Sequence, residues 1–411
     1  MRKKEPSSFL SLLTKLFLLF LPTQVGKFFW FPQSFVWGIR VDFLSFSVFL
    51  SDILILLLAV FSQKESHWLN RFLKKIKEKK TVASLIFILV FFNLAFSFRP
   101  LVSFFYLLRL LEFIFLVDFF SYFCVLGDTL FFLLLANIYV SFLSWGEFLK
   151  KASLNGIFYY LGERYFNLST PEIARFQWGD RLFLRPYSTF SHPNSLAGFL
   201  LVSSLFLWAL RRKFSSKQRF WLTVGTVFSL LTVGISFSWA AYLAFLLFLI
   251  LLIGQKLGRV RAAAVFVFVS FLVFGSFRGG LIEERSVSER LFLAKNALQL
   301  IKERPLLGVG LGNFIPAQTT LSFPRGQYNF LQPVHNIYLL IATEAGLVGL
   351  GVFVIALLYL IKLARLKSSS FLFFALCAIL FLGFFDHYWL TLKQNFFLAA
   401  VIVGVIIGRK R

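Results

Sequence analysis

The sequence predicts an all-α polytopic membrane protein with about twelve transmembrane helices and both termini in the cytoplasm. Three observations support this. Hydrophobic residues make up 58% of the 411 residues, they gather in long apolar runs, and Lys and Arg concentrate in alternate connections between those runs. A soluble globular chain is only about 45–50% apolar, and a spanning helix needs roughly 20 apolar residues. A disordered chain is therefore excluded, and a soluble enzyme is disfavoured.

We expect the whole chain, 1–411, to form a single integral membrane domain. Short breaks between some runs leave room for eleven or thirteen spans instead of twelve. The first run follows a basic N-terminus without a small-residue cleavage site, so we expect an uncleaved signal anchor. The expected spans are 8–22, 43–62, 81–98, 101–117, 128–147, 194–210, 220–236, 239–254, 262–277, 334–361, 370–385 and 390–408.

Positive charge is distributed unevenly between the connections. With the N-terminus inside, the inner segments hold more than half of the 43 Lys and Arg residues, as the positive-inside rule requires. The net charge of +25 is then mostly a topology signal, and we expect no nucleic-acid partner. Of the remaining basic residues, thirteen lie in two long outer segments, 148–193 and 278–333. These are the longest non-membrane stretches, so we expect function on the outer face.

The first outer segment ends in a pattern suited to a phosphate. It contains Arg185 and His192, followed by Pro193 and Asn194 at the start of a span. We expect Asn194 to be the helix N-cap. A helix N-terminus offers free N–H groups and partial positive charge to an anion. The residues alone leave a plain interfacial cap beside a snorkelling arginine as the alternative.

The second outer segment holds Arg290 and then an amphipathic stretch from Leu291 to Lys302. Its apolar positions recur at helical spacing, which predicts a helix lying on the outer membrane surface. A run with Arg304, Gly308, Gly310 and Gly312 follows, and it would allow a tight turn and close approach of a ligand. It is neither a dinucleotide fingerprint nor a nucleotide-hydrolase phosphate loop, because no strand precedes it and no Gly-Lys-Ser/Thr is present. The apolar positions are Leu291, Ala294, Ala297, Leu298 and Ile301.

His335 enters the next span at its outer end. Histidine titrates near neutrality and can hold or move a proton. Glu344 lies deeper in the same span, where a carboxylate usually faces a bundle interior or a wet cavity, and Gly346 and Gly349 would permit close helix packing. An interfacial histidine without a catalytic role is the open alternative.

Asp386 and His387 end the eleventh span on the same side. They could extend a site, although anchoring at the interface is favoured. No metal-ligand spacing and no nucleophile elbow is recognisable, so we expect neither a metal nor a cofactor.

Together, these segments resemble the bacterial O-antigen ligases and the related O-antigen polymerases. His335-Asn336 followed by Gly346 and Gly349 is similar to the family signature. Arg185 to Asn194 resembles its Arg…His-Pro-Asn stretch, and Arg290 with Arg304 to Gly310 resembles its Arg…Pro-x-x-Gly-x-Gly region. The resemblance is best from about 180 to 350. The sequence departs from the family at Trp239, where Arg often follows a serine.

The resemblance implies a fold similar to that of GT-C-type glycosyltransferases, which use lipid-linked sugars. It implies transfer of a glycan from a polyprenyl diphosphate to a hydroxyl group, without metal, at the periplasmic or exterior face of the cytoplasmic membrane. The acceptor would be lipid A–core in a ligase, a growing chain in a polymerase, or a protein side chain in a related oligosaccharyltransferase. A transporter or flippase of polyprenyl-linked oligosaccharides is the first alternative, although no internal repeat favours it. A scaffold protein is the second, and the oligomeric state is not predicted.

The chemistry of diphosphate displacement assigns roles to the motif residues. Arginines provide fixed charge and paired donors for phosphate oxygens, and a histidine can take the proton of the acceptor hydroxyl. We expect catalytic roles for His335 and Arg290. The expected substrate-binding residues are Arg185, His192, Asn194, Arg304, Arg325, Asn336 and Tyr338, and the expected structural residues are Gly308, Gly310, Glu344, Gly346 and Gly349.

Overall fold

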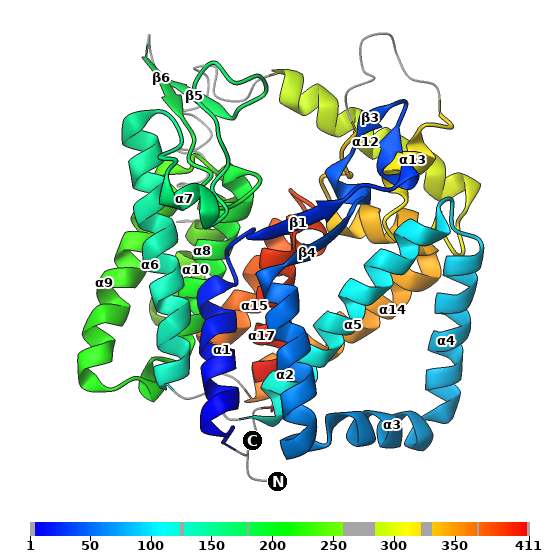
Figure 1. Cartoon of the computed structure of the whole chain (residues 1–411), viewed down its shortest axis with the longest axis horizontal. Helices are drawn as coiled ribbons and strands as arrows, with labels where there is room; N and C mark the ends of the chain where they lie inside the picture. The colour runs from blue at the N-terminus through cyan, green and yellow to red at the C-terminus, as the bar shows by residue number, and fades with distance from the viewer. Residues whose placement is uncertain are drawn as a thin grey trace.

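The computed structural model describes residues 5–123, 127–178, 181–257, 284–321, 331–367 and 370–408. It is mostly helical (Figure 1). The helices are α1 (Ser8–Phe20), α2 (Leu50–Ser66), α3 (Trp68–Glu78), α4 (Lys80–Ala95), α5 (Pro100–Tyr122), α6 (Gly127–Lys150), α7 (Ile157–Tyr160), α8 (Pro193–Ala209), α9 (Ser216–Ile235), α10 (Trp239–Leu257), α12 (Glu284–Glu303), α13 (Phe314–Gln318), α14 (Ile337–Lys367), α15 (Ser370–Leu382), α16 (Tyr388–Thr391) and α17 (Lys393–Gly408), with short 3-10 turns η1 (Pro32–Ser34), η2 (Asp42–Leu44) and η3 (Arg211–Lys213).

In the described residues, three small two-stranded antiparallel sheets, which the sequence did not predict, lie at one end of the bundle (Figure 1). They pair β1 (Gly26–Phe29) with β4 (Phe46–Phe49), β2 (Phe35–Val36) with β3 (Ile39–Arg40), and β5 (Arg175–Trp178) with β6 (Arg181–Leu184). The expected span 43–62 is therefore wrong at its start, because its first residues form η2 and β4. Burial alternates along β4, which is the period of a strand and not of a helix.

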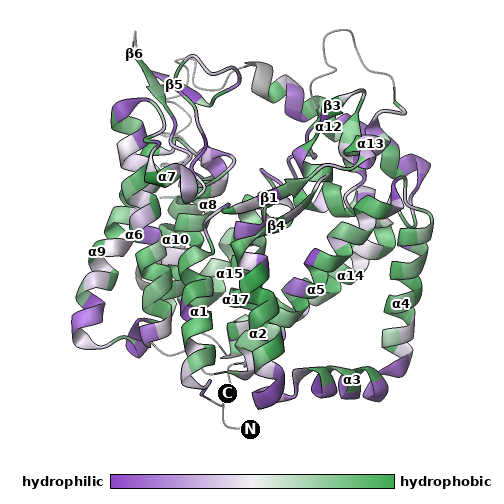
Figure 2. Cartoon of the chain, viewed as in Figure 1, coloured by the Kyte–Doolittle hydropathy of each residue, from purple (hydrophilic) through white to green (hydrophobic). Residues whose placement is uncertain are grey.

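Both ends of the chain lie at the opposite end of the bundle from these sheets (Figure 1). Helix α3 lies across this end, where Arg71 and Lys75 both pair with Asp118 of α5. Polar residues gather on α3 and at the end with the sheets, and apolar residues cover the helices between them (Figure 2). The side of the membrane on which this end lies stays a prediction.

Several apolar helices have little protein around them. Among the described residues, α5, α6 and most of α14 are long and apolar enough to span a bilayer, and six shorter apolar helices accompany them. Helix α4 has no buried residue, and Ile355 and Leu358 of α14 are more than half exposed. Such apolar surface is stable in lipid and unfavourable in water. The chain is therefore a helical membrane protein. Twelve spans stay a prediction, and the expected span 262–277 lies outside the described residues.

Two large hydrophobic cores hold the described part of the fold together, and a third, small cluster includes the end of β6. The larger one surrounds α8 and α17, nearly all of whose residues are buried. The smaller one lies under the β2–β3 hairpin and joins η2, α12, α13 and the start of α14. Helix α12 confirms the expected amphipathic helix, but it buries Leu293, Ala297 and Leu300, whereas Leu291 and Leu298 stay exposed. The smaller core fixes α12 against the segment that carries His335.

Candidate active site

His335 and Asp386 lie together, although 51 residues separate them in the chain. His335 Nδ1 is 3.2 Å from Asp386 Oδ1. The backbone positions this pair, because Ile337 N donates to the carbonyl of Gly383 at 2.8 Å. Asn336 Nδ2 adds a bond to the carbonyl of Phe384 at 3.2 Å. The start of α14 is thus pinned to the connection that follows α15.

A continuous chain of hydrogen bonds links this pair to Arg185. Asn194 Nδ2 donates to Asp386 Oδ2 at 3.2 Å, and Arg185 Nη2 donates to Asn194 Oδ1 at 2.7 Å. Arg185 Nε donates to the carbonyl of Ser236 at 2.8 Å. Each group of the Asn194 amide therefore has a partner of the right type. We call Arg185, Asn194, Asp386 and His335 the catalytic chain, after the role that we propose for them.

Arg290 reaches the same place from α12. Its Nη1 donates to the carbonyl of Phe385 at 2.6 Å, next to Asp386 in sequence. Burial alone would raise the pKa of Asp386, but interactions with His335, His387 and Arg290 outweigh it and hold that pKa well below its usual range. Asp386 is consequently ionised at neutral pH.

The electrostatics of this site favour an anion. Burial is the main reason why the pKa of Arg185 falls, to about 10, so its guanidinium keeps its charge at neutral pH. Burial also lowers the pKa of His192 and of His387 to about 3, which leaves both rings neutral. Two arginines then face one carboxylate, and the excess is positive.

The structure groups three side chains that could ligate a metal ion. Ligand atoms of His335, Asp386 and His387 lie within 4.8 Å of one another, a spacing compatible with a His₂Asp site. The sequence did not predict this group because its members come from two distant connections. Arg185 and Arg290 oppose a cation here by their charge, so the surroundings suit an anion better.

His192, and not Asn194, is the N-cap of α8. Its Nδ1 accepts from Asn194 N at 3.1 Å, and the helix begins at Pro193. Proline suits the first helical position because its missing N–H would have no partner there. The expectation that Asn194 caps the helix is wrong. Its side chain is bonded to Arg185 and Asp386 instead.

Two further expected binding residues have bonding partners within the protein at the start of α14. Asn336 Oδ1 caps this helix by accepting from Tyr338 N and Leu339 N, both at 2.9 Å. The Tyr338 hydroxyl donates to the carbonyl of Leu380 at 2.9 Å, and its ring packs against Phe384. Both side chains support the segment that presents His335.

Arg304 is not part of this group. Arg304 Nη1 donates to the carbonyl of Phe96 at 3.1 Å. It lies about 20 Å along α12 from Arg290, at 1.5 Å per residue. Arg325 lies outside the described residues.

The glycine run closes onto α14. Gly308 and Gly310 have positive φ angles of 69° and 98°, and a Cβ on Gly308 would lie 2.4 Å from the carbonyl oxygen of Thr343. The Glu344 carboxylate accepts from Gly312 N at 2.9 Å and from Phe314 N at 3.3 Å. Gly308 therefore permits a close approach to α14 and Gly310 one to Ser97, and Glu344 holds the loop in place.

Gly346 interrupts α14 where the sequence predicted an unbroken helix. Its φ of 70° and ψ of −179° belong to a region that is essentially restricted to glycine. A Cβ there would lie 2.1 Å from the carbonyl oxygen of Leu306. Gly346 was expected to let two spans pack closely, but it contacts the loop at Leu306 instead. A Cβ on Gly349 would meet only Ala345 of the same helix.

The sequence did not predict the contact of Asp386 with His335. The sequence favoured interfacial anchoring for Asp386, because an acidic residue at a helix end is common and nothing local connects this one to His335. One available signal was that Asp386 and His335 end two different spans on the same predicted side.

Comparison with known families identifies the central part of the chain. Residues 224–354 match the family model described as O-antigen ligase, which confirms the resemblance to that family. The match covers about a third of the chain and runs from α9 into α14. It includes Arg290 and His335 and excludes Arg185, Asn194 and Asp386. No curated protein matches the chain.

Proposed function

We propose that this chain, which carries an O-antigen ligase domain at residues 224–354, transfers a glycan from a polyprenyl diphosphate to a hydroxyl group at the outer face of the cytoplasmic membrane. The domain supports a role in the synthesis of cell-surface polysaccharide. The observation that carries the proposal is the catalytic chain together with Arg290, which brings a base and two fixed positive charges into one place.

The two arginines suit the leaving group. Cleavage of the bond between the anomeric carbon and the diphosphate oxygen moves an electron pair onto the diphosphate. Arg185 is held at Nε and Nη2, and Arg290 is held at Nη1. We assign their remaining N–H groups to phosphate oxygens. Fixed donors aimed at developing charge are worth about 3–4 kcal/mol each in other enzymes.

The hydrogen bond from Arg185 to Ser236 also bears on Trp239, where the sequence departs from the family pattern. Arg185 donates to the carbonyl of Ser236, in the turn that precedes Trp239 at the start of α10. This turn is where the family often has its own arginine. Arg185 therefore brings positive charge to the turn from another segment.

His335 suits the role of general base. Asp386 is ionised, so His335 Nδ1 must carry the proton in their hydrogen bond, and Nε2 keeps its lone pair. The acceptor hydroxyl passes its proton to Nε2 while its oxygen attacks the anomeric carbon and the diphosphate departs. The carboxylate of Asp386 then stabilises the imidazolium. Such acid–base assistance contributes about 10²–10⁴-fold.

The test uses purified protein, a polyprenyl-diphosphate glycan and candidate acceptors. His335→Ala and Arg290→Ala should each abolish transfer without changing thermal unfolding, and Arg212→Ala, an exposed residue of η3, should be fully active. Full activity of the first two variants would overturn the proposal. Supplying lipid A–core, growing polysaccharide or a protein acceptor in parallel identifies the acceptor class.

A liposome assay separates this proposal from transport. The protein is reconstituted with the lipid-linked glycan on one side, and both movement and bond formation are followed. Translocation without any glycosidic product would assign a transporter, whereas product formed on one side only supports the transferase.

A further inference from the structure

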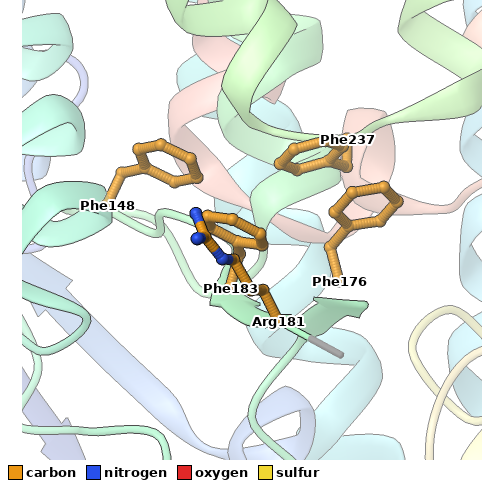
Figure 3. Close-up of a pocket in the computed structure, with 5 residues that line it drawn as sticks. All are labelled: Phe148, Phe176, Arg181, Phe183 and Phe237. Atoms are coloured by element: carbon orange, nitrogen blue, oxygen red, sulfur yellow. The ribbon is translucent and has the colours of Figure 1, made fainter. Parts of the chain in front are cut away.

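An aromatic pocket lies beside Arg185, outside the catalytic chain. Its volume is about 370 Å³, and it is lined by Phe148, Phe176, Arg181, Phe183 and Phe237 (Figure 3). This volume falls within the usual range of small-molecule sites, about 300–1,000 Å³. We call it the aromatic pocket.

Three separate elements build this pocket. Phe176 and Phe183 are cross-strand partners in the β5–β6 hairpin, so their side chains share one face of it. Phe183 stacks on Phe148 of α6 with ring centroids 5.7 Å apart, and Phe176 stacks on Phe237 at 3.8 Å. Phe237 belongs to the turn between α9 and α10. The hairpin face is thus packed against α6 and this turn through two stacked pairs.

Two of the segments that line the aromatic pocket adjoin Arg185. Strand β6 ends at Leu184, so Arg185 is the next residue. Phe237 follows Ser236, whose carbonyl accepts from Arg185 Nε at 2.8 Å. Four residues of extended chain, at about 3.3 Å each, separate Arg181 from Arg185, so the pocket begins within roughly 13 Å of the proposed phosphate site.

The lining suits an apolar chain that carries an anionic head. Four of the five lining side chains are phenylalanine, and three of those, Phe148, Phe183 and Phe237, are only partly buried. Lys151 Nζ lies 5.4 Å from the centre of the Phe183 ring and adds a cation beside the lining. A glycan needs many hydrogen-bond partners, and Arg181 is the single polar residue of the lining. An apolar chain needs none.

We propose that the aromatic pocket binds the isoprene units of the donor nearest to its diphosphate, while Arg185 holds the diphosphate itself. This assignment rests on the proposed function. It makes Phe148, Phe183 and Phe237 determinants of donor chain recognition.

Binding to the full-length protein tests this without requiring transfer. The probes are inorganic diphosphate and geranyl, farnesyl and geranylgeranyl diphosphates, and the measured quantity is the dissociation constant. For the unmodified protein, we expect affinity to rise by at least about tenfold on adding the first isoprene units, from the apolar surface they bury. Longer prenyl chains partition more strongly into detergent, so the decisive comparison is between variants at one chain length.

Matched phenylalanine variants make that comparison. Phe148→Ala and Phe183→Ala should weaken prenyl diphosphate binding about tenfold or more and leave inorganic diphosphate binding unchanged. Phe142→Ala removes a 62% exposed ring from the same helix as Phe148 and should change neither. Thermal unfolding confirms that each variant is folded.

The possible results distinguish the two proposals. Equal binding of inorganic and prenyl diphosphates, or equal competition by phosphatidylglycerol, would overturn the pocket assignment and leave the phosphate site intact. Competition by a free glycan at the aromatic pocket would overturn it as well. Loss of all diphosphate binding in Arg185→Ala together with normal transfer would instead refute the proposed function.

Discussion

Replacing Asp386 with Asn tests the catalytic chain most directly. The Asp386 carboxylate accepts from His335 Nδ1 and Asn194 Nδ2, both at 3.2 Å, and also from His387 N at 2.8 Å. An amide keeps the shape but turns one oxygen into a donor and removes the charge. One of the two side-chain donors must then lose its partner, or His335 must move its proton to Nε2 and lose its function as base.

The magnitude follows from the bond that is lost. A hydrogen bond to a charged group contributes about 1.5–3 kcal/mol, which corresponds to roughly a 10- to 150-fold loss of rate at 1.36 kcal/mol per factor of ten. The loss should appear in kcat more than in KM, because Asp386 contacts the base and we assign it no contact with phosphate.

Initial rates of transfer over a range of donor concentrations measure this effect. The matched control is Asp128→Asn at the other end of the bundle, where the exposed Asp128 accepts from Gln218 Nε2 through Oδ1. Asp128→Asn should keep the kcat of the unmodified protein. If Asp386→Asn keeps it too, or changes KM alone while unfolding normally, the assignment of Asp386 as the group that orients His335 is wrong.

Three further predictions concern stability and metal. Gly346→Ala should lower the unfolding temperature, because backbone strain there costs at least about 1–3 kcal/mol, whereas Gly351→Ala, in open space on the same helix, should raise it slightly. The folded-state pKa of His192 is lowered from 6.5 to about 3, so below pH 6.5 the unfolded chain takes up a proton that the folded one does not. Stability should therefore fall by up to about 1.4 kcal/mol per pH unit between pH 6.5 and pH 3. In thermal unfolding at stepped pH, His192→Asn, which preserves a good N-cap, should flatten this slope, and His67→Asn should not. EDTA should leave the rate of transfer unchanged, because arginines provide the positive charge. A loss of rate that Zn²⁺ restores would contradict this.

Much of the helical architecture was predictable because its signal is local. The apolar runs at 8–22 and 194–210 correspond closely to α1 and α8, since a spanning helix must be apolar along its whole length. The same reasoning placed the start of a span at 43, where the phenylalanines of β4 are apolar but alternate in burial. Composition alone does not separate such a strand from the beginning of a span.

The motifs of the candidate site could be predicted from the sequence, but the contacts between them could not. Arg185, Arg290 and His335 each stand in a recognisable local pattern. Asp386 does not, because its role depends on the packing of α15 against α8 and on the backbone bond from Ile337 to Gly383. Likewise, Gly346 stands in a helical pattern, and only the neighbouring loop explains its backbone conformation.

The catalytic chain also has an evolutionary consequence. His335 lies within residues 224–354, whereas Asn194 and Asp386 lie on opposite sides of that region. Recombination that exchanged only 224–354 between related genes would pair a base from one parent with an orienting carboxylate from another. Chimaeras of that kind should stay active only where both parents share the contact between His335 and Asp386. Inheritance of the activity therefore depends on residues outside 224–354 as well as on those within it.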